Sequence, residues 1–116
     1  MNEYHFKEDI FKILRMLSAD DNVTQRDLSR NLGISLGKTN YLLKSLTQKG
    51  FLKARAFKNK KRKLYRVGYI LTPKGFDQKV HLTYLFLKRK EKEYLELKKE
   101  FEENSKEMEL ETQGGD

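Results

Sequence analysis

The sequence contains no cysteine and no tryptophan, and Pro73 is its single proline. Without thiols the chain has neither a disulfide framework nor a thiolate metal site, which is typical of a reducing compartment. No apolar run is long enough to span a bilayer, and the N-terminus lacks the apolar region of a secretory signal. The two histidines, His5 and His81, have no cysteine or carboxylate at metal-ligand spacing. We therefore expect a cytoplasmic protein that carries no metal and no other cofactor.

Acidic residues are scarce in the first 90 positions, where 21 lysines and arginines stand against 7 aspartates and glutamates. The last 26 residues reverse this balance, with 4 cations against 10 anions. The formal charge of the whole chain is +8, and its pI is near 9.6. A basic body of this kind favours a polyanionic partner, either nucleic acid or a membrane surface.

The signatures of an enzyme are also missing. The glycines do not form a phosphate-binding loop, and no nucleophile has a base and an orienting group beside it in a recognisable pattern. A chain of 116 residues with 37% hydrophobic content supplies one modest core and little material to enclose a pocket. We therefore interpret the chain as a binding protein rather than an enzyme.

The other segments are organised around Leu32–Leu52, which reads LGISLGKTNYLLKSLTQKGFL. Ser35 is placed as the N-cap of a helix that Gly50 closes, and Gly33 ends the helix before it. The predicted buried face of the 36–49 helix consists of Thr39, Leu42, Leu43 and Leu46. The opposite face has no acidic residue and consists of Gly37, Lys38, Asn40, Tyr41, Lys44 and Ser45. Small, amide, hydroxyl and cationic groups on a helix suit the DNA major groove.

Two further helices are predicted before this stretch. The first covers residues 4–17, and its apolar face consists of Phe6, Ile10, Ile13, Leu14 and Leu17. The second begins at a capping box formed by Thr24 and Asp27 and ends near Leu32, with Val23, Leu28 and Leu32 expected to be buried. The interval of residues 33–35 is short and contains glycine, as a helix-turn-helix requires.

Two strands of a hairpin are predicted after Gly50. Residues 51–57 alternate between two sets of side chains, and residues 64–71 are rich in leucine, tyrosine, valine and isoleucine. Their connection, residues 58–63, has five cations in six positions and no anion. A segment this polar cannot lie in a core, so it must face solvent or a polyanion.

A long helix is predicted over residues 73–111, with Thr72 as its cap, Pro73 at its first position and residues 112–116 as a disordered tail. Residues 80–87 are apolar on almost every side, which predicts burial between two bodies. The apolar residues Val80, Leu87, Tyr94, Phe101 and Met108 recur every seven positions, which favours pairing of two such helices.

We expect residues 80–87 to form the core of a homodimer whose interface consists of Val80, Tyr84, Leu87, Tyr94, Leu97 and Phe101. The neighbouring line of the heptad contains Lys90 and Asn104, which weakens a long two-stranded coil. The distal third of this helix is therefore expected either to make a small adjustment to the affinity and register of the dimer or to contact another molecule through its acidic surface. The alternative to pairing is a single helix. A helix rich in lysine and glutamate can be stabilised without a partner by ion pairs between residues one turn apart.

The order of helix, helix, turn, helix, hairpin and helix resembles the winged helix-turn-helix, a mostly α fold with a small β-hairpin wing, here followed by a long C-terminal helix. The stretch Leu32–Leu52, the basic connection and the junction YILTPKG at Tyr69–Gly75 resemble MarR-type bacterial regulators. More narrowly, the chain resembles the small MarR-type proteins associated with exopolysaccharide (EPS) gene clusters. The resemblance covers residues 6–101. We expect a winged helix DNA-binding domain at 1–72, a dimerisation helix at 73–111 and a tail at 112–116.

This resemblance implies a dimeric DNA-binding transcriptional regulator, with the 36–49 helix in the major groove and the wing on the backbone or minor groove. By position, the implied DNA-binding residues are Ser35, Gly37, Lys38, Asn40, Tyr41, Lys44, Lys58, Lys60, Lys61, Arg62 and Lys63. Cations prefer guanine edges and asparagine prefers adenine, so Lys38 and Asn40 are expected to specify bases, and Tyr41 and Lys44 to meet phosphate. Typical MarR proteins dimerise through both terminal helices and often bind a phenolic ligand. The segment before residue 4 is too short to intertwine, which argues against a small-molecule effector pocket.

The leading hypothesis is a homodimer that reads an inverted repeat in double-stranded DNA and is associated with the bacterial nucleoid. The competing hypothesis is a protein-interaction module that uses the C-terminal coiled coil, with incidental DNA binding; the salt dependence of DNA binding separates the two. Binding of structured or single-stranded RNA would favour exposed aromatic stacking platforms, and few are expected here.

Overall fold

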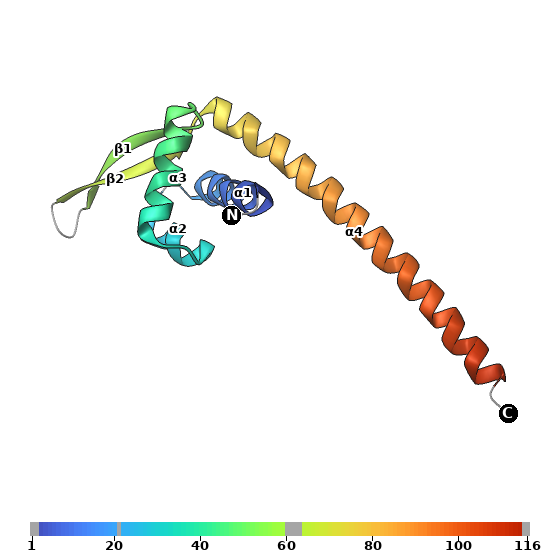
Figure 1. The fold of residues 1–116 in the computed structure, drawn as a ribbon. Coiled ribbons are helices and arrows are strands. Elements are labelled where there is room, and N and C mark those ends of the chain that lie inside the picture. Colours follow the sequence, from blue (N-terminus) through green and yellow to red (C-terminus); the bar gives the residue numbers. More distant parts are fainter. Residues whose placement is uncertain (1–2, 21, 60–63, 115–116) are drawn as a thin grey trace. The chain divides into compact units, whose positions relative to one another are not determined.

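The computed structural model describes residues 3–20, 22–59 and 64–114 (Figure 1). Its elements are, in order, α1 (Glu3–Ala19), α2 (Gln25–Leu32), α3 (Leu36–Gln48), β1 (Leu52–Asn59), β2 (Leu64–Leu71) and α4 (Pro73–Gly114). These are the predicted helices and strands in the predicted order. The fold is a winged helix-turn-helix, mostly α with one β-hairpin and a long C-terminal helix.

Internal contacts divide the chain into two compact units, Met1–Leu82 and Thr83–Asp116. The division lies inside α4 rather than at its start, where the sequence places a domain boundary. The first ten residues of α4 are therefore part of the winged helix unit. Among the described residues no helix is long and apolar enough to cross a membrane.

The core of the first unit is built from apolar side chains of α1, α2, α3 and β1, together with one residue of α4. Its members are Ile13, Leu14, Leu17, Leu28, Leu42, Leu43, Leu46, Leu52 and Leu82. The one buried polar side chain in the described part of the chain is Thr39, whose hydroxyl donates to the Ser35 carbonyl at 2.8 Å. Because this bond satisfies the hydroxyl, a threonine is tolerated in an otherwise apolar core.

Helix α2 begins and ends as its sequence predicts. Thr24 Oγ1 accepts a hydrogen bond from the Asp27 backbone at 2.9 Å, and Asp27 Oδ2 accepts one from the Thr24 backbone at 2.9 Å. Gly33 closes the helix in the left-handed conformation with φ at 68°, which glycine adopts without a steric penalty. Leu28 is fully buried, whereas Val23 and Leu32 are half-buried, because α2 is short and covers only one side of the core.

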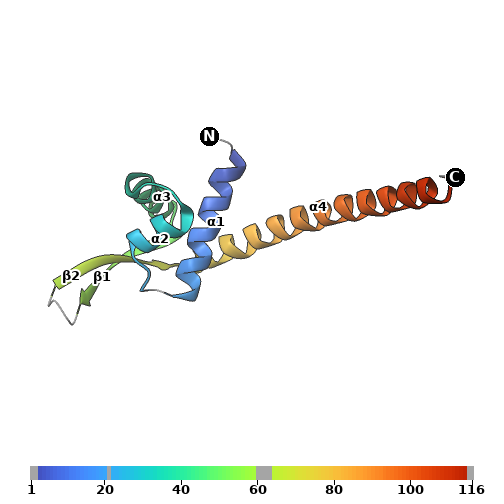
Figure 2. The same ribbon diagram turned by 90° about the horizontal axis from the view of Figure 1, so that it is seen from below.

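The helix-turn-helix places α2 and α3 against one another, and the hairpin extends beyond both helices (Figures 1 and 2). The turn between them consists of Gly33, Ile34 and Ser35. Gln25, at the start of α2, donates from Nε2 to the carbonyl of Leu36 at 3.0 Å. This bond joins the first residue of α2 to the first residue of α3, so the two helix starts are held together.

The hairpin pairs β1 with β2 in an antiparallel register in which Leu52 lies opposite Leu71 and Arg55 lies opposite Gly68. Leu52 is buried at the base, while the side chains of Lys53, Arg55 and Ala56 are exposed. The hairpin is therefore anchored in the core at its base, and Lys53 and Arg55 of β1 are exposed beside it.

The junction between β2 and α4 is fixed to the corner between α3 and β1. Thr72 accepts a hydrogen bond on Oγ1 from the Gly75 backbone at 3.0 Å, so it caps α4 with Pro73 at the first position as predicted. The same hydroxyl lies 2.6 Å from the Gly50 carbonyl, and the Thr72 amide donates to the Phe51 carbonyl at 3.1 Å. A Cβ on Gly75 would lie 2.0 Å from the Phe51 carbonyl oxygen, so only glycine permits this approach.

The second unit contains the remainder of α4, and most of its apolar side chains are exposed in the single chain. Leu87 is 61% exposed, Leu97 is 65% exposed and Phe101 is 72% exposed. The helix continues through Gly114, three residues beyond its expected end at position 111. Thr112, which the sequence places in a disordered tail, instead donates its hydroxyl to the Met108 carbonyl at 2.8 Å within the helix. Residues 115–116 lie outside the described residues.

Candidate nucleic-acid interface

The face of α3 that points away from the core is the candidate interface. The four residues predicted to be buried, Thr39, Leu42, Leu43 and Leu46, are all buried. Gly37, Tyr41 and Lys44 are exposed, with Tyr41 at 66%, while Lys38, Asn40 and Ser45 are half-buried. The helix has no acidic residue anywhere along its length. Its outward face therefore offers donors and a cation to a ligand without a carboxylate of its own to repel phosphate.

Ser35 and Gly37 shape the start of this helix. Ser35 caps α3, because its Oγ accepts a hydrogen bond from the Lys38 backbone at 3.1 Å. A Cβ added at Gly37 would meet only Ser35 Oγ, at 4.0 Å, so the space over this turn is open. A helix start with free space above it allows a nucleic acid backbone to approach closely.

Lys38 has an acidic neighbour that the sequence did not reveal. Its Nζ lies 3.9 Å from Oδ2 of Asp9 in α1, and the two side chains are 28% and 15% exposed. This distance is at the limit of an ion pair, and the pair is only partly shielded from solvent. The cation expected to read a base is therefore directed toward a carboxylate of its own chain.

The predicted wing residues are placed only in part. Lys58 belongs to β1 and lies opposite Tyr65 in the hairpin register. Lys60, Lys61, Arg62 and Lys63 lie outside the described residues. Their role in DNA contact remains a prediction from charge and position.

Several exposed groups near the helix-turn-helix were missed in the reading of the sequence. Arg26 and Arg30 are exposed on α2, and Lys53 and Arg55 are exposed on β1. Arg26 and Arg30 are four residues apart, so helical periodicity alone could have placed them on one polar face. Leu36, the first residue of α3, is 42% exposed and is available for apolar contact. No sequence pattern could have identified Asp9, because its proximity to Lys38 depends on the packing of α1.

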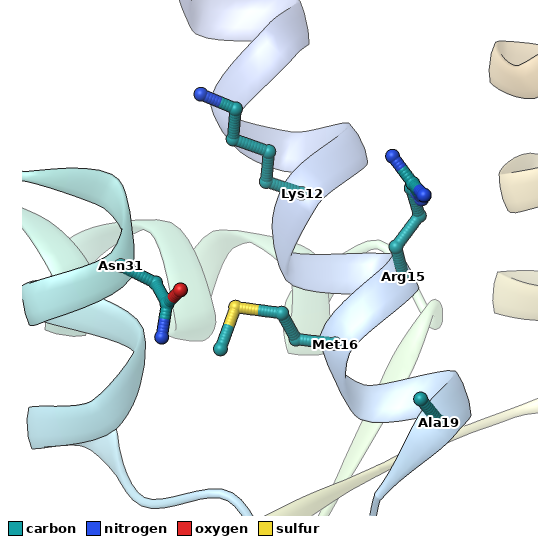
Figure 3. A pocket seen from close by; sticks show the side chains of 5 residues that line it. All are labelled: Lys12, Arg15, Met16, Ala19 and Asn31. Atoms are coloured by element: carbon teal, nitrogen blue, oxygen red, sulfur yellow. The ribbon is translucent and has the colours of Figure 1, made fainter.

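A depression of about 360 Å³ lies between α1 and α2 and is lined by Lys12, Arg15, Met16, Ala19 and Asn31 (Figure 3). Its polar groups already have partners: Lys12 pairs with Glu8 at 3.5 Å, and the Asn31 amide donates to the Asp27 carbonyl at 3.2 Å. The Arg15 guanidinium lies 5.4 Å from the centre of the Phe11 ring. We assign this depression no ligand. Across residues 3–20, 22–59 and 64–114 there is no cluster of three or more metal-ligating side chains.

Comparison with known protein families agrees with this arrangement of helices. Residues 10–53 match the family described as winged helix-turn-helix DNA-binding, and this match includes α2, the turn and all of α3. Residues 10–53 of this chain are therefore similar to a family of DNA-binding winged helix-turn-helix domains. No protein with a curated description gives a significant match.

Solved structures show the same fold. A mutant of S. aureus MepR superposes with a TM-score of 0.64 at 20% identity, over 92% of this chain and 77% of that one. S. aureus MepR bound to ethidium bromide gives a TM-score of 0.53 at 20% identity, over 92% and 76% of the two chains. Lactococcus lactis ZitR, a zinc-responsive member of the MarR family, gives 0.57 at 23% identity, over 77% of this chain and 58% of ZitR. The chain thus shares the fold of these MepR and ZitR structures.

Proposed function

We propose that this protein is a homodimeric, sequence-specific regulator of transcription that binds double-stranded DNA. Helix α3 enters the major groove, and the basic wing contacts the backbone or the minor groove. The observation that carries the proposal is the outward face of α3, which lies inside the segment that matches the DNA-binding family and has no carboxylate. The fold shared with ZitR supports a place among MarR-type regulators, and the EPS-associated subfamily remains a narrower prediction.

The residues of α3 divide into two roles in this proposal. Asn40 is half-buried, and its amide offers the donor and acceptor pair that matches an adenine edge. Lys44 and Tyr41 are exposed and long enough to reach phosphate. Ser35 and Gly37 let the start of α3 approach the backbone. Arg26 and Arg30 of α2 are added to the phosphate contacts that the sequence predicted.

The homodimer is proposed from the exposed apolar side chains of α4. Val80, Tyr84, Leu87, Tyr94, Leu97 and Phe101 are each more than half exposed in the single chain. A soluble helix with this many exposed apolar side chains at heptad spacing is stabilised by burying them against another helix. Two linked winged helices would then read the two halves of an inverted repeat and gain affinity through their connection.

The exposed face of α4 also favours a second candidate function, a protein-interaction module in which the basic face of the winged helix is incidental. The two functions differ in how DNA binding depends on sequence and salt. A specific regulator prefers its own site by a factor of about 10³ or more over unrelated DNA at fixed salt. An incidental basic surface binds every duplex alike, and its affinity falls with salt equally for all of them.

Footprinting of the bound protein on genomic DNA tests the proposal. We expect a small set of protected sites that share an inverted repeat with half-sites about 10 base pairs apart, one turn of the duplex. Protection spread evenly over the DNA, with no shared sequence, would favour the interaction module. The zinc and ethidium named for the neighbouring structures belong to those proteins, and the proposal includes no effector for this chain.

A further inference from the structure

An apolar side chain is exposed at the start of α3. Leu36 is the first residue of this helix and is 42% exposed, and Tyr41 is the other large apolar side chain of α3 that is exposed. A single exposed leucine is common on protein surfaces. What Leu36 can do therefore depends on how it is held and on what can reach it.

The backbone at Leu36 is held by two side chains of α2. Gln25 Nε2 donates to the Leu36 carbonyl at 3.0 Å, and Ser29 Oγ donates to the Ile34 carbonyl in the turn at 2.5 Å. Gln25 and Ser29 are four residues apart, so they lie on the same side of α2. Helix α2 thus fixes both the turn and the first residue of α3, and the backbone that carries the Leu36 side chain is held in place.

Leu36 lies on the same side of α3 as Asn40. The two residues are four positions apart, so helical spacing places their side chains about one turn from each other on one face. Lys38, two positions after Leu36, is about 200° around the helix from it, and its Nζ lies 3.9 Å from Oδ2 of Asp9. The start of α3 therefore directs its cation toward α1 and presents a leucine and an amide on another side.

The space beside Leu36 is open to a ligand. A Cβ added at Gly37 would meet only Ser35 Oγ, at 4.0 Å. Close approach matters here, because apolar groups are in contact only when their atoms come within about 4 Å of each other. In a helix-turn-helix the N-terminal residues of the second helix are the ones that contact base edges in the major groove. A base edge that approaches the start of α3 would therefore meet Leu36.

The chemistry of the side chain selects the base. The major groove exposes one apolar group, the C5-methyl of thymine, beside the donors and acceptors of all four bases. Leucine has no donor or acceptor, so it gains by covering a methyl group and leaves a base-edge donor or acceptor without a partner when it covers one.

From these observations we propose that Leu36 selects a thymine in each half-site of the operator by contact with its C5-methyl group. Four residues of α-helix rise about 6 Å and base pairs are about 3.4 Å apart, so this thymine lies within about two base pairs of the adenine read by Asn40. The inference rests on the proposed function and names a base that α3 reads. Gln25 is a positioning residue in this arrangement, because it acts through Leu36.

In vitro selection supplies the duplex for the test. The full-length protein is mixed with randomised double-stranded DNA at fixed salt, and the bound duplexes are recovered and sequenced. We expect an inverted repeat with thymine at one fixed position of each half-site. Recovered duplexes that share no sequence overturn the proposed function and this proposal with it.

Replacement of thymine by uracil tests the methyl group alone, because the two bases differ only at C5. Each thymine of the selected duplex is replaced in turn, at the equivalent positions of both half-sites, and binding is measured by fluorescence anisotropy. At one position the replacement should weaken binding by about fourfold for each half-site, the effect of losing one buried methyl group. Replacement at the other thymines near α3 should have little effect.

The variant Leu36→Ala assigns the sensitive thymine to this side chain. It should bind the thymine and uracil duplexes equally, whereas Asn40→Ala should still distinguish them. The matched control is Leu110→Ala, which removes a leucine of α4 that is 69% exposed and lies outside the proposed dimer interface. It should distinguish thymine from uracil as the unchanged protein does. Circular dichroism shows whether each variant is folded.

Two results overturn the role of Leu36 and leave the proposed function standing. The first is a selected duplex that the protein prefers over scrambled DNA but in which no thymine is sensitive to replacement by uracil. The second is a sensitive thymine that remains sensitive in Leu36→Ala. If Leu36→Ala does not fold, Leu36→Gln takes its place, and selection with that variant should change the thymine to adenine, whose edge glutamine matches. Continued selection of thymine by Leu36→Gln also overturns the proposal.

Discussion

Lys38 of α3 lies 3.9 Å from Asp9 of α1, measured between Nζ and Oδ2. Both side chains are partly shielded from solvent, and Lys38 is the first cation of α3. When DNA is absent, the carboxylate holds the ammonium group toward the protein. If α3 enters the major groove as proposed, phosphate and base edges compete with Asp9 for the same cation.

We expect Asp9→Asn to raise affinity for all duplexes several-fold, because it removes a negative charge beside the interface and releases Lys38 to DNA. Lys38→Ala should lower affinity by about 1–3 kcal/mol. Fluorescence anisotropy at fixed salt measures both variants. Lys12→Ala is the control, because Lys12 is an exposed cation of α1 that pairs with Glu8. Lower affinity in Asp9→Asn would show that Asp9 positions Lys38 for DNA instead of competing for it.

Glycines at two positions should respond oppositely to alanine. Gly75→Ala should destabilise the protein by about 1–3 kcal/mol, because its Cβ would overlap the Phe51 carbonyl oxygen. Gly37→Ala should stabilise it by up to about 1 kcal/mol, since alanine favours the helix and the space is open. Urea unfolding followed by circular dichroism gives both values.

The two glycine variants should also differ in their affinity for the operator. Gly37→Ala should bind the operator more weakly despite its greater stability, because its methyl group occupies the space left for DNA. A Gly75→Ala variant as stable as the unchanged protein would mean that β2 and α4 can shift at no cost, which would contradict a tight junction between Gly75 and the Phe51 carbonyl.

The wing should act through charge and not through sequence. Lys60→Gln with Lys61→Gln should flatten the plot of log affinity against log salt concentration by roughly two units or less, because each lost phosphate contact removes about 0.9 units. Operator and scrambled duplex should change alike. If the slope stays the same for both duplexes, these lysines do not contact DNA.

The dense apolar part of α4 should contribute more to the dimer than its distal end. Leu87→Asp should give a monomer or an aggregate with poor operator binding, because a charge then replaces an apolar side chain at the seam. Deletion after Phe101 should leave a dimer of lower affinity, since Leu87, Tyr94 and Phe101 remain. Sedimentation equilibrium measures both. A monomeric deletion variant beside a dimeric Leu87→Asp would reverse this assignment.

Local patterns in the sequence predicted most of the fold. The caps at Thr24, Ser35 and Thr72 depend on neighbours within three residues, so their side-chain oxygens could be assigned from spacing alone. The buried face of α3 followed from helical periodicity, because every third or fourth residue shares one side.

Features that depend on distant parts of the chain could not be predicted in this way. The approach of Asp9 to Lys38 and the contact of Gly75 with the Phe51 carbonyl join segments that are far apart in sequence. The position of the boundary within α4 depends on Leu82, whose burial in the core of the first unit is a consequence of tertiary packing. The predicted end of α4 was three residues too early. No helix-breaking residue stands just before Gly114, so the local sequence does not mark where the helix ends.

We propose that α3 reads base sequence in the major groove, and a competition titration of Asn40→Ala tests this role. The variant and the unchanged protein are each titrated with labelled operator against unlabelled operator and scrambled duplex at one salt concentration, with Lys44→Ala as the phosphate-contact control. We expect Asn40→Ala to lose about 1–3 kcal/mol of binding free energy on the operator and almost nothing on the scrambled duplex, whereas Lys44→Ala loses affinity equally on both. Equal loss on both duplexes for Asn40→Ala, or no loss on either, would contradict the claim.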